Sequence, residues 1–300
     1  MNISRKQAQR IVSSCCDAKV EGFKLFGGRI NTLYELTLSD KRHLMLRLFN
    51  ESWKARKEAF LYDQLSSLNV PIPQVLGSSD GKVPYLLYEK IPGIHIDEVY
   101  KKTKNLALFE QAGEILAKLH TMTFDKFGWI VGGAVRPAFK KWGDFALYDI
   151  GYKLGKLRAV TQMRVLRQGI LNYFDDHMGL LEVSSRPCLV HKDFYAAHIL
   201  ANPNNVVGVI DFEWAISGHN ENDFTKLERW VFPKIPESRN AFFKGYKRFG
   251  TVSSKYDERK DLYKLWHFVN MANISNEIGD KKTLSHTLKE LAACLKTCRK

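Results

Sequence analysis

The sequence predicts an α+β fold of two lobes, with an antiparallel sheet in the N-lobe and mainly helices in the C-lobe. Apolar and polar residues alternate at 34–38 and 44–48, which indicates paired strands with one buried face. After a Pro-Gly pair at 92–93, apolar residues recur mostly at helical spacing. A chain of 300 residues is long enough for two such lobes. We therefore expect an N-lobe over 1–92 and a C-lobe over 93–300.

The N-lobe begins with MNISRKQAQRIVSSCC, whose charges are spread among apolar positions, so we expect a short amphipathic helix. A Ser-Asp-Lys turn at 39–41 separates the first two strands, and a final strand is predicted at 85–88. Between them, apolar residues at 60–68 repeat with helical spacing. We expect this helix to have Ser52 as its N-cap and to end before Asn69.

The C-lobe is predicted to be helical, with one exception. Residues 189–211 hold three short apolar runs, separated by a polar loop and by an Asn-Pro-Asn-Asn turn, a pattern typical of a small β-ribbon. The helices that we expect are 108–119, 257–277, 283–298 and others within 142–178 and 222–248.

Composition restricts the class of protein and its compartment. The 46 Lys and Arg residues exceed the 32 Asp and Glu residues and give a net charge of +14, but the positive charges are scattered. We see no arginine-rich arm, zinc-finger spacing or aromatic RNA signature, so we do not expect nucleic acid as a partner. The apolar runs are too short for a membrane helix, so we expect no membrane partner. Five scattered cysteines without a secretory signal predict a reducing, cytoplasmic location.

Side chains with catalytic chemistry gather in LVHKDFYAAHILANPNNVVGVIDFEWA, residues 189–215. His191 and Asp193 begin this stretch, His198 follows, and Asp211 ends an apolar run 18 positions after Asp193. In protein-kinase-type phosphoryl transfer, one loop Asp accepts the proton of the acceptor hydroxyl. A second loop residue and an Asp after a later strand hold the metal ions. The loop pattern is H-x-D-x-x-x-x-N, and here His198 stands at the Asn position.

These residues resemble the aminoglycoside phosphotransferase and choline kinase-like family, whose members carry H-G-D-x-x-x-x-N and then a strand ending in I-D-F or I-D-W. HKDFYAAHIL and VIDFEWA match this pattern. The His in place of Asn departs from most of the family but is similar to the aminoglycoside 2″-phosphotransferases and the macrolide phosphotransferases. The resemblance extends from about residue 20 to about residue 275. It implies a bilobal protein-kinase-like fold with Asp193 as the catalytic residue and with His198 and Asp211 as metal ligands.

The resemblance also implies contacts to the nucleotide phosphates in the N-lobe. Gly27, Gly28 and Asn31, in FGGRINTLYEL, look like the hairpin that covers the phosphates, because glycines allow close backbone approach. Arg47 stands where many members have a phosphate-gripping Lys or Arg, and Glu58 matches the helix Glu that orients it. An Arg would clamp phosphate with a planar fork, whereas a Lys acts as a point charge.

The segment YLLYEKIPG resembles the connection between the lobes. Backbone groups near Glu89 and Ile91 would then meet the nucleotide base, which the sequence leaves open between ATP and GTP.

The metal is expected to be Mg²⁺, with Mn²⁺ as an alternative. Mg²⁺ favours oxygen ligands, whereas the imidazole of His198 suits softer ions better. The other interpretation is that His198 only forms hydrogen bonds within the loop and holds Asp193 in place. His191 is interpreted as a packing anchor, and Asp223 as a structural tie between the following helix and the loop.

The sequence predicts a small-molecule kinase that transfers the γ-phosphate of ATP or GTP to an acceptor hydroxyl. We expect an aminoglycoside-like antibiotic, and so a role in antibiotic resistance, or a related hydroxylated metabolite. Choline or ethanolamine, a sugar-like metabolite and a sugar-modified protein amine stay open. Four carboxylates would favour a polyamine acceptor through charged hydrogen bonds, unless they form only a solvated helix start. They are Glu213, Glu221, Asp223 and Glu228.

The alternative is a catalytically weak kinase-fold protein that binds nucleotide or regulates a partner. The departures at Arg47 and His198 motivate this alternative. The presence of both Asp193 and Asp211 at the expected separation argues against it.

Overall fold

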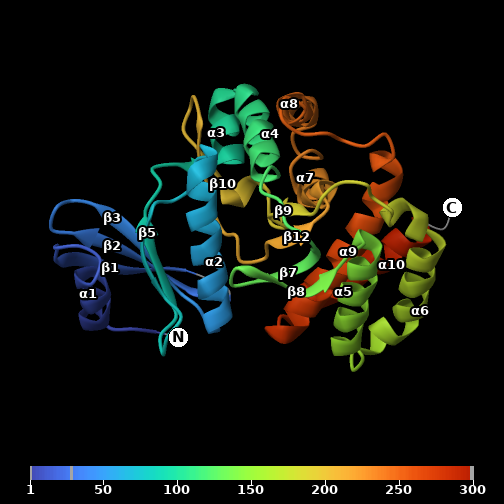
Figure 1. The fold of residues 1–300 in the computed structure, drawn as a ribbon, viewed down its shortest axis with the longest axis horizontal. Coiled ribbons are helices and arrows are strands. Elements are labelled where there is room, and N and C mark those ends of the chain that lie inside the picture. Colours follow the sequence, from blue (N-terminus) through green and yellow to red (C-terminus); the bar gives the residue numbers. More distant parts are fainter. Residues whose placement is uncertain (1, 28–29, 298–300) are drawn as a thin grey trace.

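The computed structural model describes residues 2–27 and 30–297, and it has a sheet-rich lobe and a larger helical lobe (Figure 1). The first lobe contains a five-stranded antiparallel sheet with the order β1-β2-β3-β5-β4. Its strands are β1 (Val20–Gly27), β2 (Thr32–Leu38), β3 (His43–Leu48), β4 (Val75–Ser79) and β5 (Tyr85–Glu89). The predicted bilobal α+β fold is confirmed.

One helix covers each face of this sheet. α1 (Arg5–Ser13) packs its buried Ala8 and Val12 against the face that carries Leu36 and Leu46. α2 (Ser52–Leu65) packs against the opposite face, which carries Met45. The strict alternation along β3 therefore turns Arg47 toward α2, as the sequence pattern indicated. This orientation brings Arg47 toward the helical lobe as well.

The start of α2 corrects one expectation. The N-cap is Glu51, with an extended backbone, and Ser52 is the first helical residue. The Glu51 side chain does not cap the helix but accepts a hydrogen bond from the indole of Trp53. The helix ends as predicted, because a short 3₁₀ turn at Ser66–Leu68 runs into Asn69, whose φ of 49° is left-handed.

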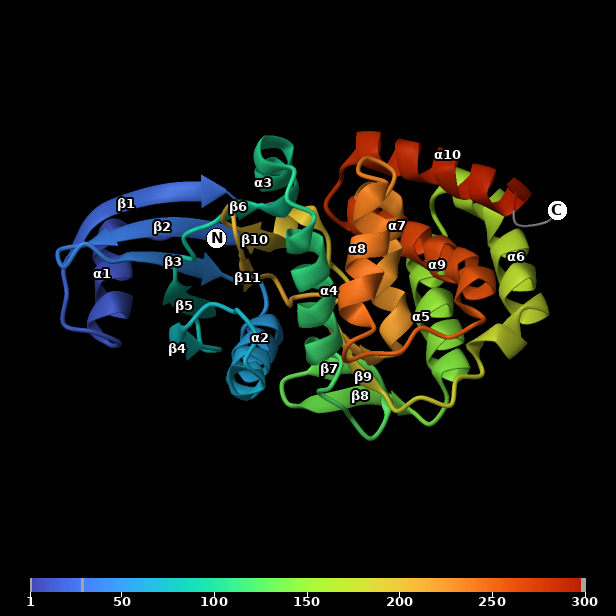
Figure 2. The same ribbon diagram turned by 90° about the horizontal axis from the view of Figure 1, so that it is seen from above.

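The helical lobe follows through β6 (Ile94–His95), and Figure 2 shows its helices gathered on the side away from the large sheet. We keep 1–92 and 93–300 as the proposed division of the chain. The helices of this lobe are α3 (Ile96–Thr103), α4 (Ala107–Leu119), α5 (Trp142–Lys156), α6 (Thr161–Asp176), α7 (Phe224–Trp230), α8 (Glu237–Tyr246), α9 (Tyr256–Glu277) and α10 (Lys281–Thr297). The first of them, α3, was not predicted from the sequence.

The three apolar runs of 189–211 form strands, but they do not form one ribbon. β10 (Ile199–Ala201) and β11 (Val206–Val209) pair with each other, and β10 also pairs with β6. β9 (Cys188–Val190) instead joins a four-stranded sheet with the order β8-β7-β12-β9. The other strands of that sheet are β7 (Phe127–Val131), β8 (Ala134–Phe139) and β12 (Ile216–Gly218). The loop after β9 is therefore held between two small sheets.

Cys15, Cys16 and Cys188 are free thiols, and Cys298 lies outside the described residues. Among residues 2–27 and 30–297, no helix combines the length and the apolar character that crossing a membrane requires.

α4 and α8 cross closely because each presents a glycine to the other. A Cβ placed at Gly245 would lie 1.9 Å from the carbonyl oxygen of Glu110, and a Cβ at Gly113 would lie 2.1 Å from that of Phe242. Both obstacles are backbone atoms, which move only if the two helices separate.

We expect Gly245→Ala to lower the free energy of unfolding by about 2–3 kcal/mol, since the added methyl group overpacks the crossing. Gly151→Ala in α5 is the matched control, because a Cβ there meets nothing within 4 Å. It should be neutral, or stabilising by about 0.5–1 kcal/mol from helix propensity. Urea unfolding measures both. Equal stability of the two variants would contradict this account of the crossing.

Candidate active site

A buried carboxylate fixes the loop that carries Asp193. The backbone N–H groups of His191 and Lys192 donate to the two oxygens of Asp223 over 2.7 and 2.6 Å. The ring of His120 lies 3.0 Å from the same carboxylate. Asp223 directly precedes α7, so the predicted tie between this helix and the loop is present.

His191 joins the loop to the strand that leads to Asp211. Its Nδ1 accepts the backbone N–H of Asp193 over 3.2 Å, and its Nε2 donates to the carbonyl of Ile210 over 3.1 Å. Only a neutral ring can accept at Nδ1. Burial lowers the pKa of His191 to about 4, which agrees with a neutral ring. His191 is thus an anchor in the geometry, as interpreted from the sequence.

Asp193 lies almost buried at the turn of the loop, with an exposed fraction of 8%. The ammonium group of Lys226, from α7, forms an ion pair with Asp193 Oδ1. Lys226 was not predicted as a site residue, because 33 positions separate it from Asp193 and the sequence around it resembles an ordinary amphipathic helix.

His198 and Asp211 face each other across the same loop. His198 Nδ1 donates to the backbone carbonyl of Asp193 over 2.8 Å, which leaves Nε2 without a proton. This Nε2 lies 3.6 Å from Asp211 Oδ2. Burial lowers the pKa of His198. Burial raises the pKa of Asp211, but the charge of Arg47 outweighs it and brings the value to about 2. Two lone pairs therefore face each other.

Arg47 gathers three carboxylates around its buried guanidinium. The distances from its Nη atoms are 3.0 Å to Glu58 Oε1, 3.1 Å to Asp211 Oδ1 and 2.6 Å to Glu213 Oε2. The predicted pair of Arg47 and Glu58 is thus in contact. The contacts to Asp211 and Glu213 were not foreseen. Lys54 adds a second cation 3.0 Å from Glu213 Oε1.

Glu58 is completely buried, and its Oε2 has no hydrogen-bond partner among the described residues. Burial raises the pKa of Glu58 to about 8, although Arg47 acts in the opposite direction. The carboxylates of Glu58, Asp211 and Glu213 lie within 4.8 Å of one another. The Arg47 guanidinium contacts all three carboxylates, so a cation already occupies this cluster.

The remaining predicted nucleotide residues lie around the large sheet. Gly27 ends β1 with a φ of 143°, and Gly28 lies outside the described residues. Asn31 donates a short hydrogen bond to Glu213 Oε2. Glu89 ends β5 and its N–H donates to the carbonyl of Gln74. Ile91 follows, and its carbonyl accepts the N–H of Gly93.

The four carboxylates that suggested a polyamine acceptor are all paired. Glu213 contacts Arg47 and Lys54, Glu221 contacts Arg259, and Glu228 contacts Arg239 over 2.8 Å. Asp223 is taken by the loop. Carboxylates that already have partners offer little to a polyamine, so these four residues do not favour an aminoglycoside.

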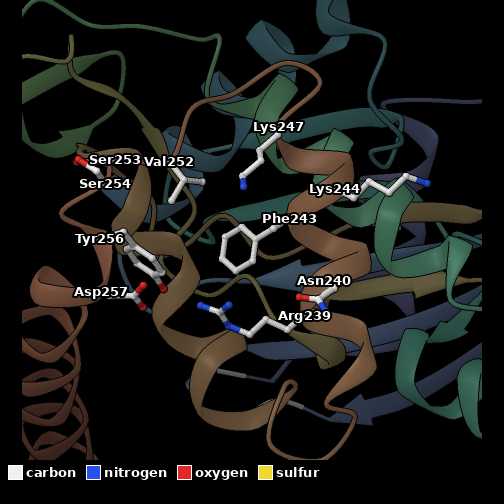
Figure 3. A pocket seen from close by; sticks show the side chains of 10 residues that line it. All are labelled: Arg239, Asn240, Phe243, Lys244, Lys247, Val252, Ser253, Ser254, Tyr256 and Asp257. Atoms are coloured by element: carbon white, nitrogen blue, oxygen red, sulfur yellow. The ribbon is translucent and has the colours of Figure 1, made fainter.

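Two cavities are relevant to an acceptor. A narrow one lies beside Asp193 and is lined by Lys192 and Lys226. A larger one of about 520 Å³ is lined by α8 and by the chain at 252–257, as Figure 3 shows. Among the residues described, none of the predicted site residues lines the larger cavity. None of them lines the narrow cavity either, but Lys192 precedes Asp193 in the chain and Lys226 pairs with it.

Comparison with known proteins identifies a matching family and similar proteins. A model described as the phosphotransferase enzyme family matches residues 23–262. A curated protein named "Probable ketoamine kinase", from Synechocystis, is 26% identical over 269 residues, which are 83% of this chain and 82% of that protein. A protein of the same name from Vibrio cholerae is 31% identical over 187 residues, which are 58% of this chain and 61% of its own length.

Solved structures share the fold at low sequence identity. The gentamicin complex of APH(2″)-IIa superposes with a TM-score of 0.70 at 20% identity and covers 97% of both chains. A thermostable mutant of aminoglycoside phosphotransferase APH(4)-Ia, with AMP-PNP and hygromycin B, gives 0.72 at 16% identity and covers 96% of this chain and 97% of its own.

The neutral state that His191 requires predicts a dependence of stability on pH. Its pKa is about 4 when folded and about 6.5 when unfolded. The unfolded chain therefore binds more protons between these values, so stability is complete above pH 6.5 and is lost as the pH falls toward 4. This one ring should cost about 2 kcal/mol between pH 7 and pH 5.

Urea unfolding at pH 7 and pH 5 measures this loss. Asn offers a similar acceptor without titrating, so His191→Asn should lose about 2 kcal/mol less than the wild type over this interval. The comparison cancels other buried rings, such as His219, whose pKa burial lowers to about 3. The same pH dependence in both proteins would show that His191 does not titrate in this way.

Proposed function

The chain belongs to the phosphotransferase enzyme family, and we propose that it is a kinase that transfers the γ-phosphate of ATP to a sugar hydroxyl of a ketoamine. It is a phosphotransferase that uses an alcohol group as acceptor. A ketoamine is an amine joined to a ketose sugar, and this class includes the sugar-modified amines that the sequence left open. The single observation that carries the mechanism is the facing pair of His198 and Asp211 behind Asp193.

Asp193 is proposed as the catalytic base. Its carboxylate lies on a loop that Asp223 and His191 fix, beside the narrow cavity. It would accept the proton of the sugar hydroxyl as that oxygen attacks the γ-phosphorus. Phosphoryl transfer depends mainly on positioning and charge neutralisation, so a rigid loop matters more than an unusual pKa.

His198 and Asp211 are proposed to hold a divalent metal between them. Donor atoms bound at about 2.1 Å to one ion lie roughly 3–3.6 Å apart, and the observed separation of 3.6 Å fits this range. The Nδ1 hydrogen bond of His198 fixes the ring with Nε2 toward Asp211, as metal-binding histidines require. The metal supplies neutralisation of the phosphate charge when it is bound.

Arg47 is proposed to act at the nucleotide phosphates, with Glu58 orienting it. Its guanidinium is buried and forked, and phosphate oxygens would compete with Asp211 and Glu213 for its N–H groups. Gly27, Gly28 and Asn31 would lie over the phosphates, and the backbone at Glu89 and Ile91 would lie near the base.

A second candidate function is nucleotide binding without efficient transfer. The ion pair between Lys226 and Asp193 favours it, because it occupies the base that the reaction needs. The same pair is compatible with catalysis if an acceptor draws Lys226 away.

The acceptor class is tested with the purified chain, ATP or GTP, and Mg²⁺. We expect phosphate transfer from ATP to N-fructosyl and N-ribulosyl amines, and little transfer to aminoglycosides. Asp193→Asn should lower kcat by about 10²–10⁴-fold, the usual contribution of a positioned base, while nucleotide affinity changes little. Efficient transfer to aminoglycosides alone would contradict the proposed acceptor, and full activity of Asp193→Asn would contradict the proposed base.

The metal assignment predicts a change in preference between ions. Imidazole binds Mn²⁺ better than it binds Mg²⁺, so Mn²⁺ should support turnover at least as well as Mg²⁺ in the wild type. His198→Asn replaces the ring by an oxygen ligand and should shift the ratio of the two activities toward Mg²⁺. Steady-state rates over a titration of each ion measure this ratio. An identical ratio in both proteins would favour the interpretation that His198 only orders the loop.

A further inference from the structure

The narrow cavity beside Asp193 has an unusual balance of charge. Two lysines line it, Lys192 from the loop and Lys226 from α7. The other side chains that matter here are Trp266, His267 and Asn270 of α9. None of the described residues that line this cavity is an Asp or a Glu. Its polar groups therefore suit an anion rather than a cation.

Lys192 has no carboxylate of its own. Its ammonium lies 4.7 Å from the centre of the Trp266 ring, and no described residue forms an ion pair or a hydrogen bond with it. Burial lowers the pKa of Lys192 to about 7, with the charge of Lys153 as a further cause. A partly desolvated ammonium without a counter-ion is unfavourable, and an anionic ligand would supply one.

The charges of Asp149 and Asp223 affect the pKa of Lys192, but both carboxylates already have other partners. Asp149 accepts hydrogen bonds from the indoles of Trp129 and Trp266 over 2.7 and 2.6 Å, and it pairs with Lys153. Asp223 binds the loop and His120, as described above. Their charges act to raise the pKa of Lys192, but their oxygens are engaged in these other contacts.

Lys226 pairs with Asp193, the carboxylate that is proposed as the catalytic base. Its ammonium pairs with Asp193 and lies 5.1 and 5.3 Å from the ring centres of Tyr195 and Trp230. The two lysines of the cavity thus have one carboxylate between them, and that carboxylate is the proposed base.

His267 adds an independent sign of a ligand. It is 8% exposed, and its Nε2 is buried without a hydrogen-bond partner among the described residues. Burial lowers the pKa of His267 well below its usual value, so the ring is neutral and can donate one hydrogen bond. Buried polar atoms are nearly always paired, and His267 is one of the residues that line the cavity, so a ligand there is a candidate for the missing partner.

We propose that Lys192, Lys226 and His267 form an anion subsite that binds a carboxylate or phosphate group of the acceptor. The identity of the acceptor as a ketoamine rests on the proposed function, whereas the preference for an anion rests on this cavity. A polycation would meet two ammonium groups here. An acceptor anion would also give Lys226 a second partner and would leave Asp193 free to accept the hydroxyl proton.

The cavity has room for about one water molecule in this structure, near 10 Å³. A carboxylate or phosphate is larger, so Lys226 must swing away from Asp193 when the acceptor enters. A lysine has a flexible stem that allows this movement. Binding of the acceptor anion would therefore release the Asp193 carboxylate from Lys226.

The first arm of the test compares three matched acceptors that differ only on the amine half. They are N-fructosyl-glycine, N-fructosyl-phosphoethanolamine and the uncharged N-fructosyl-glycinamide. In the wild type, KM should be about tenfold lower for at least one anionic acceptor than for the amide, since charge-assisted hydrogen bonds are lost with the anion. The two anionic compounds distinguish a carboxylate from a phosphate.

Lys192→Met keeps the apolar stem and removes the charge, and it should abolish this difference in KM. Lys226→Met is the second variant and should do the same. Lys264→Met, at an exposed lysine of the same helix as His267, is the matched control and should keep the wild-type ratio. Thermal unfolding confirms that each variant is folded. An equal KM for all three acceptors in the wild type would overturn the subsite and leave the kinase function standing.

The second arm does not depend on transfer. Acetate and inorganic phosphate are titrated by calorimetry into the protein with saturating ADP and Mg²⁺. Binding of either anion by the wild type, weakened about tenfold or more in Lys192→Met, supports the subsite even if no ketoamine is phosphorylated, in which case only the proposed function fails. No anion binding, or equal binding by wild type and Lys192→Met, overturns the subsite.

Discussion

The buried guanidinium of Arg47 is the interaction on which the site depends. It comes from β3 of the large sheet and holds Glu58 of α2 together with Asp211 and Glu213 of the helical lobe. One cation therefore joins three segments that are distant in the sequence. A buried charge is tolerated only when it is paired, so this contact fixes the position of Asp211 relative to the sheet as well as to the loop. The facing of His198 and Asp211 follows from that position.

The same rule accounts for the rest of the helical lobe near the loop. Asp223, Glu221 and Asp149 are all buried, and each is paired with cations or N–H groups. These pairs make the frame of the site rigid and electrically balanced. Lys192 departs from the rule because it is half-buried and its ammonium has no ion pair among the described residues. A departure from charge pairing in an otherwise balanced region is where a ligand group is expected.

The candidate residues of the loop could be found in the sequence because they are close together in the chain. Asp193, His198 and Asp211 lie within 19 residues, and short apolar runs between them become strands that hold the spacing. The α+β class and the long helices were predicted from the spacing of apolar residues, which is also a local feature of the chain. What the sequence missed depends on distant contacts. α3 is short, and β7, β8 and β12 find their partners only in the folded chain.

Charge partners were the least predictable feature. Lys226 meets Asp193 across 33 positions, and Arg47 meets Glu213 across 166. In the sequence, Lys226 and Arg47 look like the solvent-exposed charged residues around them. The acidic residues from 213 to 228 suggested a site for a polyamine, because a sequence shows charges and not their partners. The expected N-cap at Ser52 moved by one residue to Glu51, where the backbone is extended.

The central claim is that His198 and Asp211 hold the metal of a phosphoryl-transfer site. Pulsed electron paramagnetic resonance of Mn²⁺ bound to the chain with ADP tests it most directly, because a coordinated imidazole gives a ¹⁴N coupling. The account predicts this coupling in the wild type, its loss in His198→Asn with Mn²⁺ still bound, and weak Mn²⁺ binding in Asp211→Asn. Bound Mn²⁺ without a nitrogen coupling in the wild type, or with a coupling that persists in His198→Asn, would contradict it.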